Sequence, residues 1–254
     1  MKINTVKQAL KEGKVQIGTS FGMLRSPDVG RILAAAGFHW AFIDCEHGWL
    51  GLESVRDICQ ASTEAGMMPI VRVADLQYDL VARGLDCGGM GIMLPRVESP
   101  ELLERAVSWT KYPPVGIRGY GLTPHHVGYA KAGIPDVIAH MNEHVMVVLQ
   151  IETVKALEMR DEILSVKGID AVMIGPADFS IALGVPGDFM NPKLIKAMEQ
   201  VRDSCLKYGI APGTQTRHLQ LGKFWRDNGM LFLGCSSEVG MMYDRGVELT
   251  KALA

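Results

Sequence analysis

The chain has 254 residues, a formal net charge of −2, 48% hydrophobic residues and 21% charged residues. This composition supplies the core of one large domain and excludes extended disorder, and the lack of a basic excess argues against a nucleic-acid partner. The apolar stretches are far shorter than the roughly 20 residues of a membrane helix. The N-terminus also lacks the apolar segment of a signal peptide. We therefore expect a cytoplasmic protein without membrane or nucleic-acid partners.

The cysteines give the same indication about the compartment. Their number is odd and no two of them form a C-x-x-C pair, which in a chain of this length is typical of reduced thiols. We expect most of them to be small core residues. They are Cys45, Cys59, Cys87, Cys205 and Cys235.

Short apolar runs alternate with amphipathic stretches of helical length along the whole chain. The runs are apolar on both faces, as are strands of a parallel sheet that is covered on both sides. In chain order we predict strand 17–22, helix 27–36, strand 40–44, helix 52–65, strand 69–73, helix 78–85, strand 91–94, helix 100–110, strand 145–151, helix 154–164, strand 171–174, helix 192–208, strand 210–214, helix 219–228, strand 231–234 and helix 240–253. Eight such pairs predict an α/β fold, a single-domain (β/α)₈ TIM barrel over residues 1–254.

Residues 112–144 break this alternation. The segment is rich in proline and glycine, and we expect a long ordered loop with one or two short helices. Loops of this length inside a compact domain are usually functional. His125 and His126 lie in it, where a solvated or lid position is favoured over a catalytic one.

The residues that follow the predicted strands are the candidates for chemistry, because the active sites of such barrels lie at the carboxyl ends of the strands. Several carboxylates at one barrel mouth repel each other unless a cation lies between them. The candidates are Asp44, Glu46, His47, Arg72, Arg96, Gln150, Glu152, Gly175, Pro176, Ala177, Asp178, Gln215 and Glu238.

Glu152 and Asp178 end the neighbouring strands five and six. Two carboxylates in that relation, with water completing an octahedron, suit a hard divalent ion such as Mg²⁺ or Mn²⁺. The alternative is that each carboxylate caps the helix that follows it. The residues alone do not decide between a ligand and a cap.

His47 stands beside two acids at the end of strand two, where it is either a general base or a structural histidine. Arg72 ends an apolar strand and needs an anionic partner, which is either a substrate oxyanion or an acid of the rim. The backbone amides of the turn 175–178 either hold a carboxylate or only lead into the next helix.

Six segments match one protein family in the right order: residues 42–48, 71–73, 94–99, 112–119, 150–152 and 174–180. They contain Glu46-His47-Gly48, Gln150-Ile151-Glu152 and, from Gly175 onward, the sequence GPADFS. Together they resemble the HpcH/HpaI aldolases, the class II pyruvate aldolases that depend on a metal. The resemblance extends from about Thr5 to about Thr250.

The resemblance implies an activity and a cofactor. The activity is reversible aldol cleavage of a 4-hydroxy-2-oxo acid to an aldehyde and pyruvate, or a close 2-oxo acid such as hydroxypyruvate, through an enolate on bound Mg²⁺, Mn²⁺ or Co²⁺. Glu152 and Asp178 are implied as metal ligands, with Arg72 at the enolate oxygen and His47 as the base. Substrate contacts are implied for Gln150, Gly175, Pro176 and Ala177, and supporting roles for Asp44 and Glu46.

The resemblance also implies an oligomer. Asp86 is similar to the acid that pairs with the catalytic histidine in this family, but in one barrel it would lie at the end opposite His47. We therefore expect Asp86 to reach His47 of another subunit. The implied assembly is a homo-hexamer, a trimer of dimers, with the C-terminal helix, about residues 239–253, exchanged between subunits.

Some positions depart from the family pattern and leave the aldehyde acceptor open. Arg96 stands where many members carry an apolar Met, and the turn 234–238 and the loop 122–129 also differ. A lysine-dependent aldolase is disfavoured because no predicted strand ends in Lys. A CoA-ester lyase or phosphonomutase-like relative remains an alternative, and a non-catalytic binding barrel is a more remote one.

Overall fold

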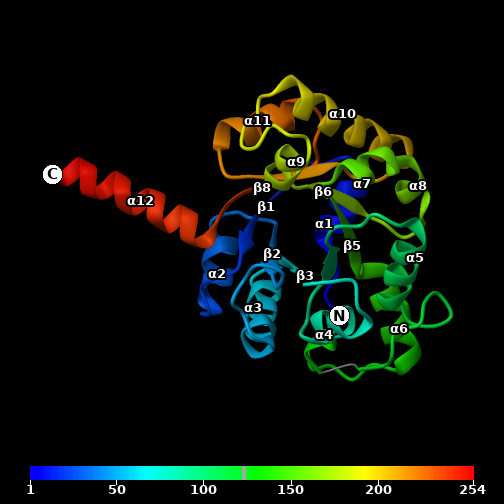
Figure 1. Cartoon of the computed structure of the whole chain (residues 1–254). Coiled ribbons are helices and arrows are strands. Elements are labelled where there is room, and N and C mark those ends of the chain that lie inside the picture. The colour runs from blue at the N-terminus through cyan, green and yellow to red at the C-terminus, as the bar shows by residue number, and fades with distance from the viewer. Residues whose placement is uncertain (122–123) are drawn as a thin grey trace.

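In a computed structural model, which describes residues 1–121 and 124–254, eight parallel strands close into a barrel in the order β1 to β8 (Figure 1). The predicted TIM barrel is therefore confirmed. The strands are β1 (Gln16–Phe21), β2 (Trp40–Asp44), β3 (Met68–Arg72), β4 (Gly91–Leu94), β5 (Met146–Ile151), β6 (Ala171–Ile174), β7 (Gly213–Thr216) and β8 (Phe232–Ser237).

Helices surround the barrel in the described part of the chain. They are α1 (Thr5–Lys11), α2 (Asp28–Ala35), α3 (Leu52–Glu64), α4 (Tyr78–Asp86), α5 (Pro100–Trp109), α6 (Ile134–His144), α7 (Val154–Glu158), α8 (Arg160–Ser165), α9 (Pro176–Ala182), α10 (Pro192–Lys207), α11 (Leu219–Asp227) and α12 (Glu238–Leu253), with a 3₁₀ turn η1 (Pro124–Val127). Within residues 1–121 and 124–254, none of them combines the length and apolarity that a membrane crossing requires.

Several predicted boundaries were wrong. Strand β7 begins at Gly213, after the expected start, because Pro212 has no N–H for the ladder and only an isolated bridge at Ala211 precedes it. The single helix expected over 154–164 is divided at Met159 into α7 and α8. Helices α1 and α9 were not predicted, and α6 forms inside the segment expected to be mostly loop.

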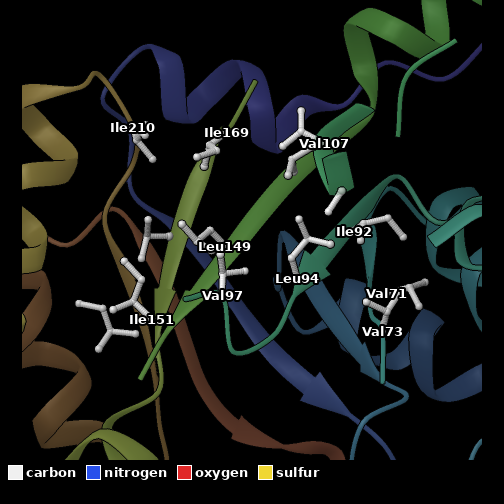
Figure 2. Packing of buried hydrophobic residues seen from close by; sticks show 14 of the residues in the cluster. Val71, Val73, Ile92, Leu94, Val97, Val107, Leu149, Ile151, Ile169 and Ile210 are labelled. Atoms are coloured by element: carbon white, nitrogen blue, oxygen red, sulfur yellow. The ribbon is translucent and has the colours of Figure 1, made fainter. Parts of the chain in front are cut away.

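The strands carry two different apolar faces. Along β5, Met146 and Val148 pack with the side chains of one cluster, whereas Val147 and Leu149 pack with those of another. The second cluster also contains residues of the surrounding helices, and Figure 2 shows some of its members, among them Leu149 and Ile151. The first cluster therefore fills the barrel interior, and burial of both faces explains why the runs read as continuously apolar.

Large aromatic rings fill the barrel interior at the end where the strands begin. Trp40 of β2 stacks on Phe232 of β8, with the ring centroids 3.9 Å apart. Strand β1 lies between these two strands, and its Gly18 is required because any Cβ there would collide with the indole of Trp40. Helix α1 closes this end of the barrel with the buried side chains of Val6 and Leu10.

Helix α12 leaves the barrel and projects away from it, as the red ribbon in Figure 1 shows. Its only buried residue is Glu238 at its first position, whereas Tyr243 is 72% exposed. The Glu238 carboxylate accepts hydrogen bonds from the consecutive backbone N–H groups of Gly22, Met23 and Leu24, at 2.9, 2.6 and 3.2 Å. The start of the helix is thereby bound to the loop that follows β1.

Two lysines contact the same carbonyl oxygen at the end of the barrel where the strands begin. Lys7 and Lys111 both donate to the carbonyl oxygen of Val145, at 3.1 and 2.8 Å, and Lys7 also pairs with Asp170 at 3.1 Å. Burial, followed by the charge of Lys7, lowers the pKa of Lys111 to about 7 from its ordinary value of 10.5. Asp170 opposes this shift only in part.

The Lys111 pKa predicts how stability depends on pH. Between pH 7 and pH 10.5 the unfolded chain binds more protons at this residue than the folded chain, so the free energy of unfolding rises with pH across that window. Lys111→Met should remove a contribution of up to about 1.4 kcal/mol per pH unit. Urea unfolding from pH 7 to pH 9.5 measures it, with the exposed Lys131→Met as control. Parallel curves for wild type and Lys111→Met would contradict the assignment.

Candidate active site

The inner face of the barrel changes from apolar to polar at the carboxyl ends of the strands. Asp44 lies two residues after Phe42, and Arg72 two residues after Ile70, so both continue the inward-facing side of their strands. Gln150 follows Val148 in the same way on β5. Asp44 and Arg72 are also direct neighbours in the register of β2 and β3.

A two-pronged ion pair joins Asp44 and Arg72. Arg72 donates from Nε to Oδ1 at 3.0 Å and from Nη2 to Oδ2 at 2.6 Å, and its guanidinium lies 5.2 Å from the centre of the Phe42 ring. Burial alone would raise the Asp44 pKa, but Arg72 and the backbone amides of His47 and Glu46 outweigh it and hold that pKa below its usual value. Asp44 therefore remains a carboxylate that fixes the orientation of Arg72.

Glu46 gathers three cationic or titratable side chains. Its Oε2 lies 3.2 Å from Nη1 of Arg72, and its Oε1 lies 3.1 Å from Nε of Arg96. Oε1 is also 3.8 Å from Nε2 of His47, whose side chain is half exposed at the mouth. Glu46 itself is almost completely buried, so its charge is compensated by the two arginines.

Gln150 connects the arginine to Glu152. Its Oε1 accepts from Nη1 of Arg72 at 3.4 Å, and its Nε2 donates to Oε2 of Glu152 at 2.6 Å. A continuous chain of contacts thus runs from Asp44 through Arg72 and Gln150 to Glu152. The absence of a side chain at Gly175 leaves room for the contact between Gln150 and Glu152, since a Cβ at that position would lie 2.5 Å from Oε2 of Glu152.

The surroundings of Glu152 disfavour the charged form of its carboxyl group. It is 4% exposed, and burial, followed by the charges of Asp178 and Glu46, raises its pKa to about 7. The helix-cap alternative does not hold for Glu152, because the Thr153 hydroxyl caps α7 by accepting from Ala156 N–H.

Asp178 lies exposed in the first turn of α9, close enough to Glu152 to affect its pKa. The described residues contain no group of three or more His, Cys, Asp and Glu arranged to hold a metal. Two carboxylates nevertheless fit Mg²⁺ or Mn²⁺, which keep most of their positions for water and substrate oxygens. The residues present are therefore compatible with a divalent metal. At the same turn Pro176 is buried and Ala177 is exposed.

The structure does not bring Asp86 and His47 together within one chain. Asp86 is the last residue of α4 and precedes β4, so it lies at the end of the barrel opposite His47. Its Oδ1 accepts from Nη2 of Arg118 at 2.7 Å. Arg118 is fully buried, with its guanidinium 4.7 Å from the Tyr112 ring centre. This partner was missed at the sequence level, although Arg118 lies within the family-like segment 112–119.

Other rim candidates lie outside the contact chain. Glu238 binds the loop after β1, as described above, and Gln215 donates to the carbonyl of Ser236 at 2.8 Å. His126 is partly buried, and its Nε2 atom lies 2.7 Å from the carbonyl oxygen of Leu85, so the solvated or lid position expected for it stays a prediction. The side chain of His125 lies outside the described residues.

A parallel barrel that gathers two arginines, a histidine and four acids at the carboxyl ends of its strands has the make-up of a barrel enzyme. Residues 19–241 match the HpcH/HpaI aldolase/citrate lyase family, and the chain belongs to that family. It is accordingly a carbon–carbon lyase.

Named relatives cover nearly the whole chain. A 4-hydroxy-2-oxo-heptane-1,7-dioate aldolase of Escherichia coli is 35% identical over 243 residues, which are 94% of this chain and 90% of the relative. The crystal structure of an HpcH/HpaI aldolase from Desulfitobacterium hafniense is 31% identical, with a TM-score of 0.92 over 97% of this chain and 95% of that one. An HpcH/HpaI aldolase/citrate lyase family protein from Burkholderia cenocepacia is 27% identical, with a TM-score of 0.89 and coverage of 98% and 99%.

The Asp44–Arg72 pair makes a prediction about stability. Asp44→Ala should lower the free energy of unfolding by about 3 kcal/mol, because it leaves a largely buried guanidinium without its main partner. The control is Asp57→Ala, which breaks an exposed pair with Arg56 and should cost less than about 1 kcal/mol. Urea unfolding of both variants makes the comparison. Equal losses would show that solvent replaces Asp44 around Arg72.

Proposed function

We propose that the enzyme catalyses the reversible aldol cleavage of a 4-hydroxy-2-oxo acid to pyruvate and an aldehyde with the help of a divalent metal. The observation that carries this proposal is the contact chain from Asp44 through Arg72 and Gln150 to Glu152, which places a fixed positive charge beside a buried carboxylate. The names of the enterobacterial relatives support the reaction class.

Glu152 and Asp178 would hold the metal, with Mg²⁺, Mn²⁺ and Co²⁺ as the candidates. When bound, the metal would polarise the ketone and carboxylate oxygens of pyruvate as a Lewis acid. Glu152 suits this role because burial and its acidic neighbours disfavour its charge in the absence of a cation. Gln150 donates to Oε2 of Glu152 and so fixes which way the carboxylate points.

Arg72 would stabilise the enolate oxygen. Cleavage of the bond between C3 and C4 leaves its electron pair on the pyruvate fragment, and the negative charge collects on the former ketone oxygen. A guanidinium that is already oriented by Asp44 and Glu46 stabilises that charge without having to reorganise.

His47 would transfer the protons, since an imidazole titrates near neutral pH. In cleavage the C4 hydroxyl loses its proton to His47 as the aldehyde forms, and the protonated His47 then returns a proton to the enolate carbon. In condensation His47 starts the removal of a proton from the pyruvate methyl group. Gly175 lies against Gln150 and Glu152, so residues 175–177 would bring the backbone close to the substrate carboxylate.

The site would be shared between subunits. Asp86 lies at the wrong end of its own barrel to orient His47, and Arg118 holds it in place there. Helix α12 projects from the barrel with apolar side chains exposed, including Met242, Tyr243 and Leu253. Exchange of this helix in a homo-hexamer built as a trimer of dimers would cover these residues and bring Asp86 to His47 of a neighbour.

The first test is deuterium exchange into the methyl group of pyruvate, followed by NMR without any aldehyde. Exchange should be absent from metal-stripped enzyme and return with Mg²⁺, Mn²⁺ or Co²⁺. Glu152→Ala should lose at least about 100-fold in exchange rate, because one of the two carboxylates is gone. Thermal unfolding of the variant controls for folding.

Methyl exchange together with an acyl-CoA cleavage assay distinguishes the pyruvate aldolase from the alternative functions. Absence of exchange from folded wild-type enzyme with every metal would contradict pyruvate aldolase chemistry. Cleavage of acyl-CoA substrates would then identify a CoA-ester lyase on the same barrel. Inactivity in both assays would favour a non-catalytic binding barrel.

Mixing two inactive variants tests the shared site. His47→Ala subunits are exchanged with Asp86→Asn subunits, in which the asparagine still accepts the hydrogen bond of Arg118. Randomly mixed pairs should recover about a quarter of wild-type activity, because half of the pairs contain one intact site of two. Mass spectrometry confirms the exchange. Mixed assemblies without activity would place Asp86 outside the site.

A further inference from the structure

Arg96 stands at the barrel mouth, two residues after the end of β4. Its Nε pairs with Oε1 of Glu46 at 3.1 Å, which ties it to the same carboxylate that contacts Arg72. Its side chain is 64% exposed, compared with 11% for that of Arg72. Arg96 therefore lies on the solvent side of Glu46, and Arg72 lies on the inner side.

The backbone of Arg96 is strained. Its φ of +49° lies in the left-handed region, which an arginine adopts only when the surrounding structure imposes it. Glycine would adopt this conformation without strain. Strained positions of this kind concentrate at ligand sites, where they aim a side chain that an ordinary turn would direct elsewhere.

The two arginines differ in the donors that they have left. Arg72 commits Nε and Nη2 to Asp44 and Nη1 to Glu46 and Gln150. Arg96 approaches Glu46 most closely through Nε, and within residues 1–121 and 124–254 its two terminal nitrogens make no hydrogen bond. A planar pair of N–H donors on a fixed stem matches a carboxylate.

We propose that Arg96 binds a carboxylate at the end of the aldehyde remote from its reacting carbonyl, and so selects acidic semialdehydes. This inference rests on the aldol reaction proposed above. The pyruvate end of the site lies on the inner side of Glu46, at Arg72 and Glu152, so the outer guanidinium is left for the other reactant. The corresponding 4-hydroxy-2-oxo acid would be a dicarboxylate held at both ends.

The experiment compares two aldehydes of equal length, succinic semialdehyde and butanal, at saturating pyruvate and metal. The readout is the ratio of their kcat/KM values in each variant. Arg96→Met should lower this ratio by roughly tenfold or more, and Arg96→Lys by less, because lysine keeps the charge but loses the planar fork. Arg96→Gly should lower it as far as Arg96→Met while relieving the backbone strain, so a folding defect is not the cause.

Matched controls are available on the same rim. Arg25 follows β1 and Arg217 follows β7, and both are exposed. Arg25→Met and Arg217→Met should leave the ratio as in wild type. A drop in either control that equals the drop in Arg96→Met would show a general effect of rim charge and overturn the assignment.

Two other outcomes would also overturn it. An unchanged ratio in both Arg96→Met and Arg96→Gly would mean that Arg96 does not recognise the charge of the aldehyde. A raised KM for pyruvate with both aldehydes equally affected would place Arg96 at the pyruvate end. Methyl exchange by wild-type enzyme distinguishes these results from failure of the aldol proposal, because loss of exchange removes both proposals together.

Discussion

The ion pair between Asp44 and Arg72 is the interaction around which the barrel mouth is organised. It joins the ends of two neighbouring strands, and its two hydrogen bonds fix the plane of the guanidinium as well as its position. Glu46 and Gln150 then contact the remaining nitrogen of Arg72. Gln150 also donates a hydrogen bond to Glu152 and so orients that carboxylate. A misplaced Arg72 would disturb every one of these contacts, which makes this pair the common support of the site.

The fold follows from the sequence because its signals are local. Eight apolar runs buried on both faces and the intervening amphipathic stretches are sufficient to specify a parallel barrel, and the carboxyl ends of the strands then locate the mouth. The element boundaries and the helix that were predicted wrongly also have local causes. Pro212 delays β7, and the proline- and glycine-rich composition around α6 hides a helix whose stability comes from packing Val137 and Met141 into the core.

The contacts within the candidate site were harder to predict from the sequence, because they join residues that are far apart along the chain. Glu46 and Arg96 are separated by two strands, and nothing near either residue indicates that they meet. The pairing of Asp86 with Arg118 depends in the same way on how a loop folds back over α4. The strained backbone of Arg96 is likewise a product of the tertiary structure, since an arginine in the sequence gives no indication of a positive φ.

The attachment of Glu238 restricts how helix α12 can move. Three N–H groups converge on one carboxylate oxygen at the start of α12, so a pivot of this helix at its base would strain all three bonds. An arm whose direction is set before it meets a neighbour loses little conformational entropy when it docks. The loop that holds it, residues 22–24, follows β1 at the barrel mouth. A displacement of the base of α12 would therefore also displace the loop after β1, which lies at the rim of the barrel mouth.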